Sequence, residues 1–116
     1  MENSSKIQAV LKNVIEYGWQ VVELKNCGLT EIPRELFDFP QIVSIDLSND
    51  SFIEEQYKNK IKEIPSEISK IKNLARLDLE NNIVEKVNEN ISQLRKLNYL
   101  NLNNNRLSEI SEKIAN

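Results

Sequence analysis

The sequence predicts an α/β solenoid, in which short repeated units stack side by side and bury their apolar faces against one another. Three observations lead to this prediction. An apolar pattern begins anew at Trp19, Ile42, Leu74 and Leu97, with spacings of 23, 32 and 23 residues. Each copy holds a short apolar–polar alternation that is typical of a half-buried strand. Self-similarity at such a period is the sequence signature of repeat architectures, because each unit packs only against its neighbours.

The amino-terminal segment does not share the repeat. Its apolar residues between Ile7 and Ile15 fall at helical spacing, and Gly18 is suited to end a helix. We therefore predict a capping helix over residues 1–18 that covers the open edge of the first repeat, because an exposed sheet edge promotes association. The alternative is an amphipathic arm that binds a membrane or a partner, although only two lysines supply its positive charge.

Within a repeat, Leu77-Asp78-Leu79 is the predicted strand, and Asn82 follows where the chain must turn away from the sheet. An asparagine side chain at that place can donate to and accept from backbone groups that the turn leaves unpaired. Stacked copies would then form a ladder of hydrogen bonds. The expected ladder positions are Cys27, Asn59, Asn82 and Asn105.

The chain returns from each strand through a segment that is expected to hold a short helical turn. Pro33 and Pro65 begin two of these segments, and apolar residues three apart follow them, as in Leu36 with Phe39. The repeat thus combines one strand with one short helical turn.

The repeat resembles the leucine-rich repeat. The segment from Leu97 to Leu107 fits the pattern L-x-x-L-x-L-x-x-N-x-L at every position, and the segment 74–84 fits with valine in the last place. The segment 19–29 carries Cys27 in place of the asparagine, a replacement that the family accepts. The Ile-Pro-x-x-Leu continuation is similar to the 23-residue class of Ras-suppressor and scribble-type proteins and to the leading domains of Roco GTPases. The resemblance implies a horseshoe segment with short parallel strands on its concave face.

The second repeat carries nine extra residues, which we expect to loop out between Ser48 and Lys58. Asn59 would then resume the repeat, and Asp50 with Phe52 is a competing register. Long loops in compact folds are often binding elements. The apolar residues of this insertion either bind a partner or fold back onto the solenoid edge. They are Phe52, Ile53 and Tyr57.

No matching cap is visible at the carboxyl end, where the sequence stops at Asn116, one residue before an expected apolar position. We expect either a fragment of a longer protein or a short chain whose last repeat is covered by a partner or, through self-association, by a second copy of itself. The predicted organisation is a capping helix over 1–18 and four repeats over 19–116, divided into 19–41, 42–73, 74–96 and an incomplete 97–116.

Composition narrows the classes of function. The net charge of −3 is too mild to predict a nucleic-acid or membrane partner. A single cysteine excludes an internal disulfide and suits a reducing compartment. The apolar run near the amino terminus is interrupted by polar residues, so neither a signal peptide nor a transmembrane segment is predicted. The expected location is the cytoplasm.

Enzymatic chemistry is not expected. The chain has no histidine, so the commonest general base and zinc ligand are absent. Its glycines stand alone and form no phosphate-binding loop. Cys27 lacks a histidine partner, and the acidic residues lack the spacing of a calcium loop. We predict no cofactor and no metal.

Function is expected on the concave sheet face, as a module that binds another protein with a basic surface and acts as an adaptor or sensor. Tyrosine and arginine are common interface anchors, and a row of acidic residues would attract cationic side chains. The alternatives are the recognition segment of a larger Roco-type signalling protein and a bacterial effector. The candidate partner-binding residues are Glu23, Asp46, Arg76, Asp78, Tyr99 and Asn101.

Overall fold

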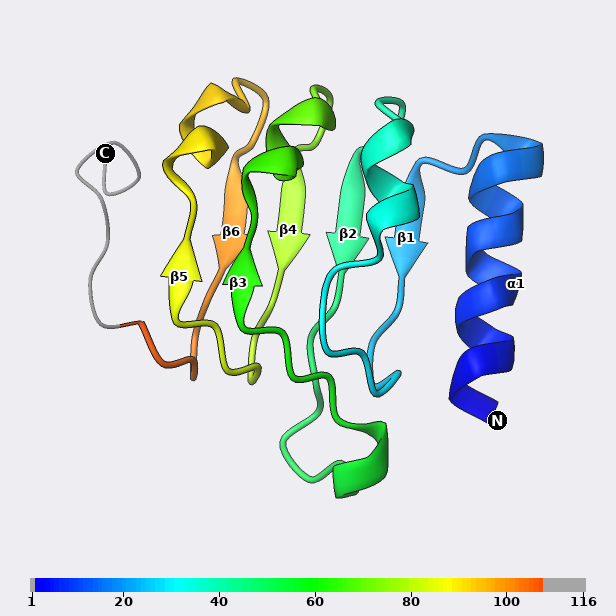
Figure 1. Cartoon of the computed structure of the whole chain (residues 1–116), viewed down its shortest axis with the longest axis vertical. Helices are drawn as coiled ribbons and strands as arrows, with labels where there is room; N and C mark the ends of the chain where they lie inside the picture. The colour runs from blue at the N-terminus through cyan, green and yellow to red at the C-terminus, as the bar shows by residue number, and fades with distance from the viewer. Residues whose placement is uncertain (1, 108–116) are drawn as a thin grey trace.

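The structure, a computed structural model, describes residues 2–107, with side chains described from residue 4. Four short parallel strands form the main sheet in the order β1-β2-β4-β6. Figure 1 shows them side by side and pointing the same way. They are β1 (Val21–Glu23), β2 (Ser44–Asp46), β4 (Arg76–Asp78) and β6 (Tyr99–Asn101). Consecutive repeats therefore stack as neighbours, and the predicted solenoid with parallel strands is confirmed.

The segments that return the chain contain a second, smaller sheet that the sequence did not indicate. Its strands β3 (Glu63–Ile64) and β5 (Lys86–Val87) pair in parallel and run opposite to the main strands in Figure 1. Pro33 and Pro65 directly precede two of the expected helical turns, which are 3-10 helices. The 3-10 helices of the returning segments are η1 (Arg34–Asp38), η3 (Ser66–Lys70) and η4 (Glu89–Gln93), and a further one, η2 (Glu55–Tyr57), lies in the insertion.

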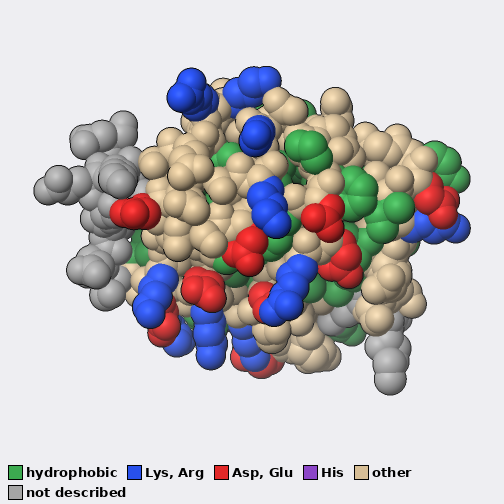
Figure 2. Space-filling view, turned by 45° about the horizontal axis from the view of Figure 1, so that its top comes forward, with side chains coloured by type: hydrophobic (Ala, Val, Ile, Leu, Met, Phe, Trp, Pro, Cys, Tyr) green, Lys and Arg blue, Asp and Glu red, His purple; other side chains and the backbone are tan. Residues whose placement is uncertain are grey.

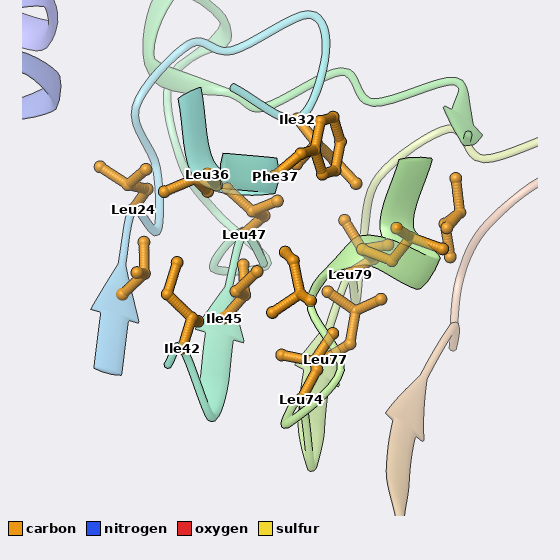
Figure 3. Close-up of a cluster of buried hydrophobic side chains, with 14 of the residues drawn as sticks. Leu24, Ile32, Leu36, Phe37, Ile42, Ile45, Leu47, Leu74, Leu77 and Leu79 are labelled. Atoms are coloured by element: carbon orange, nitrogen blue, oxygen red, sulfur yellow. The ribbon is translucent and has the colours of Figure 1, made fainter. Parts of the chain in front are cut away.

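The hydrophobic core fills the interior between the main sheet and the returning segments. Leu24, Leu47 and Leu79 each follow a main strand and are fully buried. Figure 3 shows them with Leu36 and Phe37, which η1 supplies to the same cluster. Full burial of a leucine side chain contributes about 1.5–3 kcal/mol. The repeats therefore depend on one another, because each supplies one wall of its neighbour's core.

Helix α1 (Glu2–Tyr17) lies beside β1 at one end of the stack in Figure 1. Leu11 and Val14 are 5% and 1% exposed and belong to the common core. Gly18 ends the helix at a φ of 66°, and its amide donates to the Val14 carbonyl at 3.1 Å. Ile15 is 56% exposed, although its spacing predicted that it would lie on the apolar face of the helix. The buried face of α1 is therefore narrower than the sequence predicted. The helix packs on the first repeat. That the first repeat requires this helix as a cap stays a prediction.

Three asparagines adopt the left-handed conformation directly before the expected ladder position. Asn26, Asn81 and Asn104 have φ values of 55°, 64° and 58°. Asparagine tolerates this conformation because its short polar side chain bonds locally. The Asn104 side-chain nitrogen donates to the Asn81 side-chain oxygen at 2.9 Å, and the Asn81 side chain donates to the Asn49 carbonyl at 2.8 Å. A second row of asparagines thus joins the turns.

The end of the fourth repeat lies outside the described residues. This applies to Ile110 and Ile114, and to the uncapped surface through which self-association is expected. In the described part of the chain, α1 is too short and too polar to cross a bilayer, and no other helix there could do so.

Candidate functional site

The exposed face of the main sheet, here called the sheet face, corresponds to the predicted concave face. The strand register aligns Glu23, Asp46, Asp78 and Asn101 in one row across the four strands, which we call the central column. The nine-residue insertion does not disturb this row, because Asp46 pairs directly with Asp78. Three carboxylates are therefore carried on adjacent strands.

Most of the central column has a structural role that the sequence did not reveal. Asp46 and Asp78 each accept a hydrogen bond from the backbone amide two residues further on, at 2.9 and 3.0 Å. Asn101 does the same at 3.0 Å. An uncharged amide oxygen therefore serves this turn as well as a carboxylate does. The Glu23 side chain is exposed and, among the described residues, makes no hydrogen bond or ion pair.

Arg76 and Tyr99 come together on β4 and β6. The strand register pairs them, and the Arg76 guanidinium carbon lies 4.6 Å from the centre of the Tyr99 ring. A weak ion pair to Asp78 at 3.4 Å also holds the guanidinium. The Arg76 side chain and Tyr99 are both 42% exposed. Stacking holds the flexible Arg76 side chain against the Tyr99 ring in advance, which lowers the entropy that a partner must remove on binding.

The insertion leaves the sheet between two asparagines that bond to each other. The Asn59 amide donates to the Asn49 side-chain oxygen at 2.7 Å, and the Asn49 side-chain nitrogen donates back to the Asn59 carbonyl at 2.8 Å. Asn49 is only 3% exposed. The amide of Gly28 also donates to the Tyr57 carbonyl at 3.0 Å. Sequence reasoning missed Asn49, because its partner lies ten residues away across the insertion.

Asp50 anchors the first half of the insertion to the preceding repeat. Its carboxylate pairs with the Lys25 ammonium at 2.7 Å and accepts from the Asn26 side chain at 2.8 Å. The hydrogen bond to Lys25 lowers the pKa of the Asp50 carboxyl and raises that of Lys25. Lys60 and Glu55 form a similar pair at 2.8 Å, whose hydrogen bond lowers the pKa of Glu55. These two ion pairs hold the insertion against the solenoid.

The three apolar residues of the insertion have different environments. Phe52 is 99% exposed, whereas Ile53 and Tyr57 are half-buried. Asp50 and Phe52 do not resume the repeat, so the competing register does not occur. Two of the residues therefore pack toward the solenoid, and Phe52 alone is fully presented to solvent.

Asn59 occupies the ladder position of the second repeat and is fully buried. Its side-chain oxygen accepts from the amides of Cys27 and Leu29 at 3.2 and 2.8 Å. Its side-chain nitrogen donates to the carbonyls of Leu24 and Leu47 at 2.9 and 3.0 Å. One amide group thus ties together two repeats.

Asn82 and Asn105 lie at the same position of later repeats. The Asn82 side chain bonds to the amide of Ile61 at 3.0 Å and to the Leu47 carbonyl at 2.9 Å. The Asn105 side chain accepts from the Val84 amide at 2.7 Å. These bonds replace main-chain pairing where the chain leaves the sheet.

Cys27 lies at the corresponding place of the first repeat and is 1% exposed. Its thiol donates one weak bond to the Lys25 carbonyl at 3.3 Å. Burial raises the pKa of the thiol above its ordinary value. The environment suits a structural residue, because a reactive cysteine needs a lowered pKa and access to solvent.

Charged side chains of both signs are interspersed over much of the face that Figure 2 shows. Among the side chains of residues 4–107, no three cysteine or carboxylate groups gather closely enough to hold a metal ion. Of the carboxylates in the central column, Glu23 is exposed, Asp46 is half-buried and Asp78 is 6% exposed. The sheet face thus offers one exposed carboxylate and a stacked arginine–tyrosine pair.

Comparisons with known proteins agree with the repeat and the fold. A leucine-rich-repeat sequence model matches residues 96–116. The structure is similar to that of a leucine-rich-repeat protein of Leptospira interrogans, with a TM-score of 0.60 and 24% identity. That similarity covers 93% of this chain but 31% of the Leptospira chain, so this chain spans less than a third of its length. A comparison with curated proteins gave no match. The fold is therefore that of leucine-rich-repeat proteins, and the sequence of the repeat is matched over residues 96–116.

Proposed function

We propose that this chain is a non-catalytic module that binds another protein through its sheet face. Leucine-rich-repeat domains generally mediate protein–protein interactions and are generally not enzymes. The observation that carries the proposal is the stack of Arg76 on Tyr99, which is exposed on adjacent strands beside the central column. Arginine and tyrosine dominate binding energy at many interfaces, since both present a large planar surface and a polar group.

The partner is expected to present basic groups near the central column. Glu23 and Asp46 lie opposite each other on adjacent strands, which are spaced by about 4.8 Å in a sheet. Like charges at such a distance repel one another by about 1 kcal/mol in bulk water and by more when water is excluded. A lysine or arginine of the partner would relieve that repulsion. Charge complementarity of this kind chiefly speeds association and makes it depend on salt.

The test separates the anchor from the charge. After a partner has been isolated by capture on the full chain, Tyr99→Ala should weaken its binding about tenfold or more, mainly through faster dissociation. Asp46→Asn should instead slow association and flatten its salt dependence, because the amide keeps the turn acceptor and removes only the charge. Arg95→Ala is the matched control, since Arg95 is exposed outside the sheet face. Equal binding by all three variants in surface plasmon resonance would refute this use of the sheet face.

The insertion is the rival interface, and the full exposure of Phe52 favours it. A phenylalanine side chain that is fully exposed to water is unfavourable, and burying it in a pocket of the partner would contribute binding free energy. Phe52→Ser should then abolish binding that Tyr99→Ala leaves unchanged. Because Phe52 makes no core contact, the variant should keep the parent's melting temperature, and a loss of binding could not be attributed to unfolding.

The proposed setting is the cytoplasm, with an adaptor or sensor role. The same surface would serve the recognition segment of a larger Roco-type signalling protein or a bacterial effector. The gene sequence beyond codon 116 distinguishes these roles. A following GTPase domain would favour the Roco-type role, and a cell-fractionation experiment tests the location.

A further inference from the structure

A pocket of about 550 Å³ lies where α1 meets β1, away from the Arg76–Tyr99 stack. Its lining combines apolar side chains with one carboxylate: Val10, Trp19, Gln20, Val21 and Glu23. Trp19 is 47% exposed and Val21 is 49% exposed, so the apolar wall is open to solvent. Pockets of this size that pair apolar walls with a few polar groups are typical binding sites.

The backbone beside this pocket belongs to an edge strand. Strand β1 is the first of the four strands and has a main-sheet neighbour on one side only. The Gln20 carbonyl accepts from Ser44 at 3.1 Å, and the Leu24 amide donates to the Asp46 carbonyl at 2.9 Å. Successive residues of a strand in a parallel sheet direct their backbone groups to alternate sides.

Gln20 and Leu24 flank β1 and direct the backbone groups just described toward β2, whereas Val21 and Glu23 occupy the alternate positions. Their backbone groups therefore point away from β2, toward the edge that the pocket borders. No strand of the described chain pairs with this edge, and α1 lies beside it and supplies the opposite wall of the pocket through Val10. Unpaired strand edges are templates for the addition of an extended peptide.

The charge at this edge selects one kind of peptide. Glu23 lies on the pocket wall, is exposed and has no charged partner among the described residues. Asp46 lies next to it in register and adds a second negative charge. The Lys25 ammonium is held by Asp50 at 2.7 Å and also interacts with the charge of Asp46, but it forms no ion pair with Glu23. A cationic side chain is the complement that the edge lacks.

We propose that β1 and the pocket bind an extended segment of a partner protein as an additional strand, with an apolar side chain in the pocket and a lysine or arginine against Glu23. Val21 and Glu23 are two residues apart, so their side chains project to the same face of the strand. The apolar and basic residues of the bound segment are therefore also two apart. This inference rests on the proposed function. It specifies which kind of partner segment binds at the β1 end of the sheet face.

The test uses the single tryptophan of the chain as its probe, because Trp19 lines the pocket. Ten-residue peptides of serine and threonine with one leucine and one lysine two positions apart are titrated into the full chain, and Trp19 emission is recorded. Peptides with glutamate in place of lysine are the charge control. The lysine peptides should shift the emission to shorter wavelength and bind at least about tenfold more tightly than the glutamate peptides.

Two further comparisons test the strand pairing and the charge separately. Lysine peptides are N-methylated on alternate residues in either of two registers. The register that methylates the amides facing β1 cannot donate backbone hydrogen bonds to that strand and should lose binding at least about tenfold, whereas the other register should keep it. Glu23→Lys should reverse the preference for lysine over glutamate. Glu85→Lys makes the same charge change at an exposed place outside the main sheet and should leave the preference unchanged.

An unchanged Trp19 emission with every peptide would overturn the inference. So would equal binding by both N-methylated registers, or an unaltered charge preference in Glu23→Lys. These results leave the proposed function standing if a partner protein still loses affinity with Tyr99→Ala. Conversely, tight lysine-peptide binding with no effect of Tyr99→Ala on any partner would retain the pocket and reject the proposed anchor.

Discussion

Replacement of Asn59 by alanine is the sharpest test of how the repeats are joined. The variant removes a side chain that is 0% exposed and that makes four hydrogen bonds to the turn backbone. Two amides and two carbonyls would lose this partner inside the protein, where water cannot easily replace it. Among the described residues, the Leu47 carbonyl keeps a second side-chain donor, Asn82 at 2.9 Å, whereas the Cys27 and Leu29 amides and the Leu24 carbonyl have no other side-chain partner.

The expected cost follows from the number of bonds. A typical intramolecular hydrogen bond contributes about 0.5–1.5 kcal/mol net, so four of them predict a loss of about 4 kcal/mol in the free energy of unfolding. A domain of this length is stable by roughly 6–17 kcal/mol. Asn59→Ala should therefore remove a large part of its stability, and Asn82→Ala, with three bonds, somewhat less.

Equilibrium unfolding in urea, followed by far-ultraviolet circular dichroism, measures the difference. Asn103→Ala is the matched control, because the exposed Asn103 side chain makes no hydrogen bond, and it should stay within about 0.5 kcal/mol of the parent. Asp50→Ala tests the competing register and should also be mild. A change below about 1 kcal/mol for Asn59→Ala, or a larger one for Asp50→Ala, would refute the ladder assignment.

Four further predictions follow from individual contacts. Leu79→Ala should cost about 2–5 kcal/mol in urea unfolding, because the leucine is fully buried, and a near-neutral change would argue against its core position. Deleting residues 1–17 should cause aggregation, visible by light scattering, whereas a stable soluble remainder would identify α1 as a dispensable arm. Cys27 should react with a thiol reagent much more slowly in the native protein than in denaturant, since burial hides the thiol and raises its pKa. The lowered pKa of Asp50 means that its ion pair with Lys25 stabilises the fold above the ordinary pKa of aspartate, and that this stabilisation is lost as the pH falls through the pKa of the folded state. Lys25→Met should therefore raise the pKa of Asp50 in an NMR titration. An unchanged pKa would exclude the ion pair.

Periodicity determined more of this structure than composition did. The strands at Val21–Glu23, Ser44–Asp46, Arg76–Asp78 and Tyr99–Asn101 lie where the repeated apolar–polar alternation predicted them. Successive residues of a strand point alternately to the core and to the solvent, so the register of a strand decides which residues lie on each face of the sheet. The same argument predicted which residues share the sheet face, although their role in binding stays a prediction.

The insertion could not be read from the periodicity, because nine extra residues interrupt it. Asp50 and Asn59 both fitted the repeat on local grounds, and only the tertiary structure distinguishes them. The Asn59 side chain reaches backbone groups of the first repeat, whereas Asp50 pairs with Lys25 in solvent. Nothing in the sequence between Ser48 and Lys58 encodes this choice, since both partners belong to an earlier turn of the solenoid.

The sequence alone determined the order of the strands, the inward leucines and the position of the central column, because all three follow from one local period. Only the tertiary structure decided that Asp46 and Asp78 accept turn hydrogen bonds, that Glu23 has no such bond, and that α1 and β1 leave a pocket beside Trp19. These features depend on where a side chain ends in space and on what a neighbouring element leaves uncovered. A period specifies which way each residue points, but the packing of non-repeated elements decides what surrounds it.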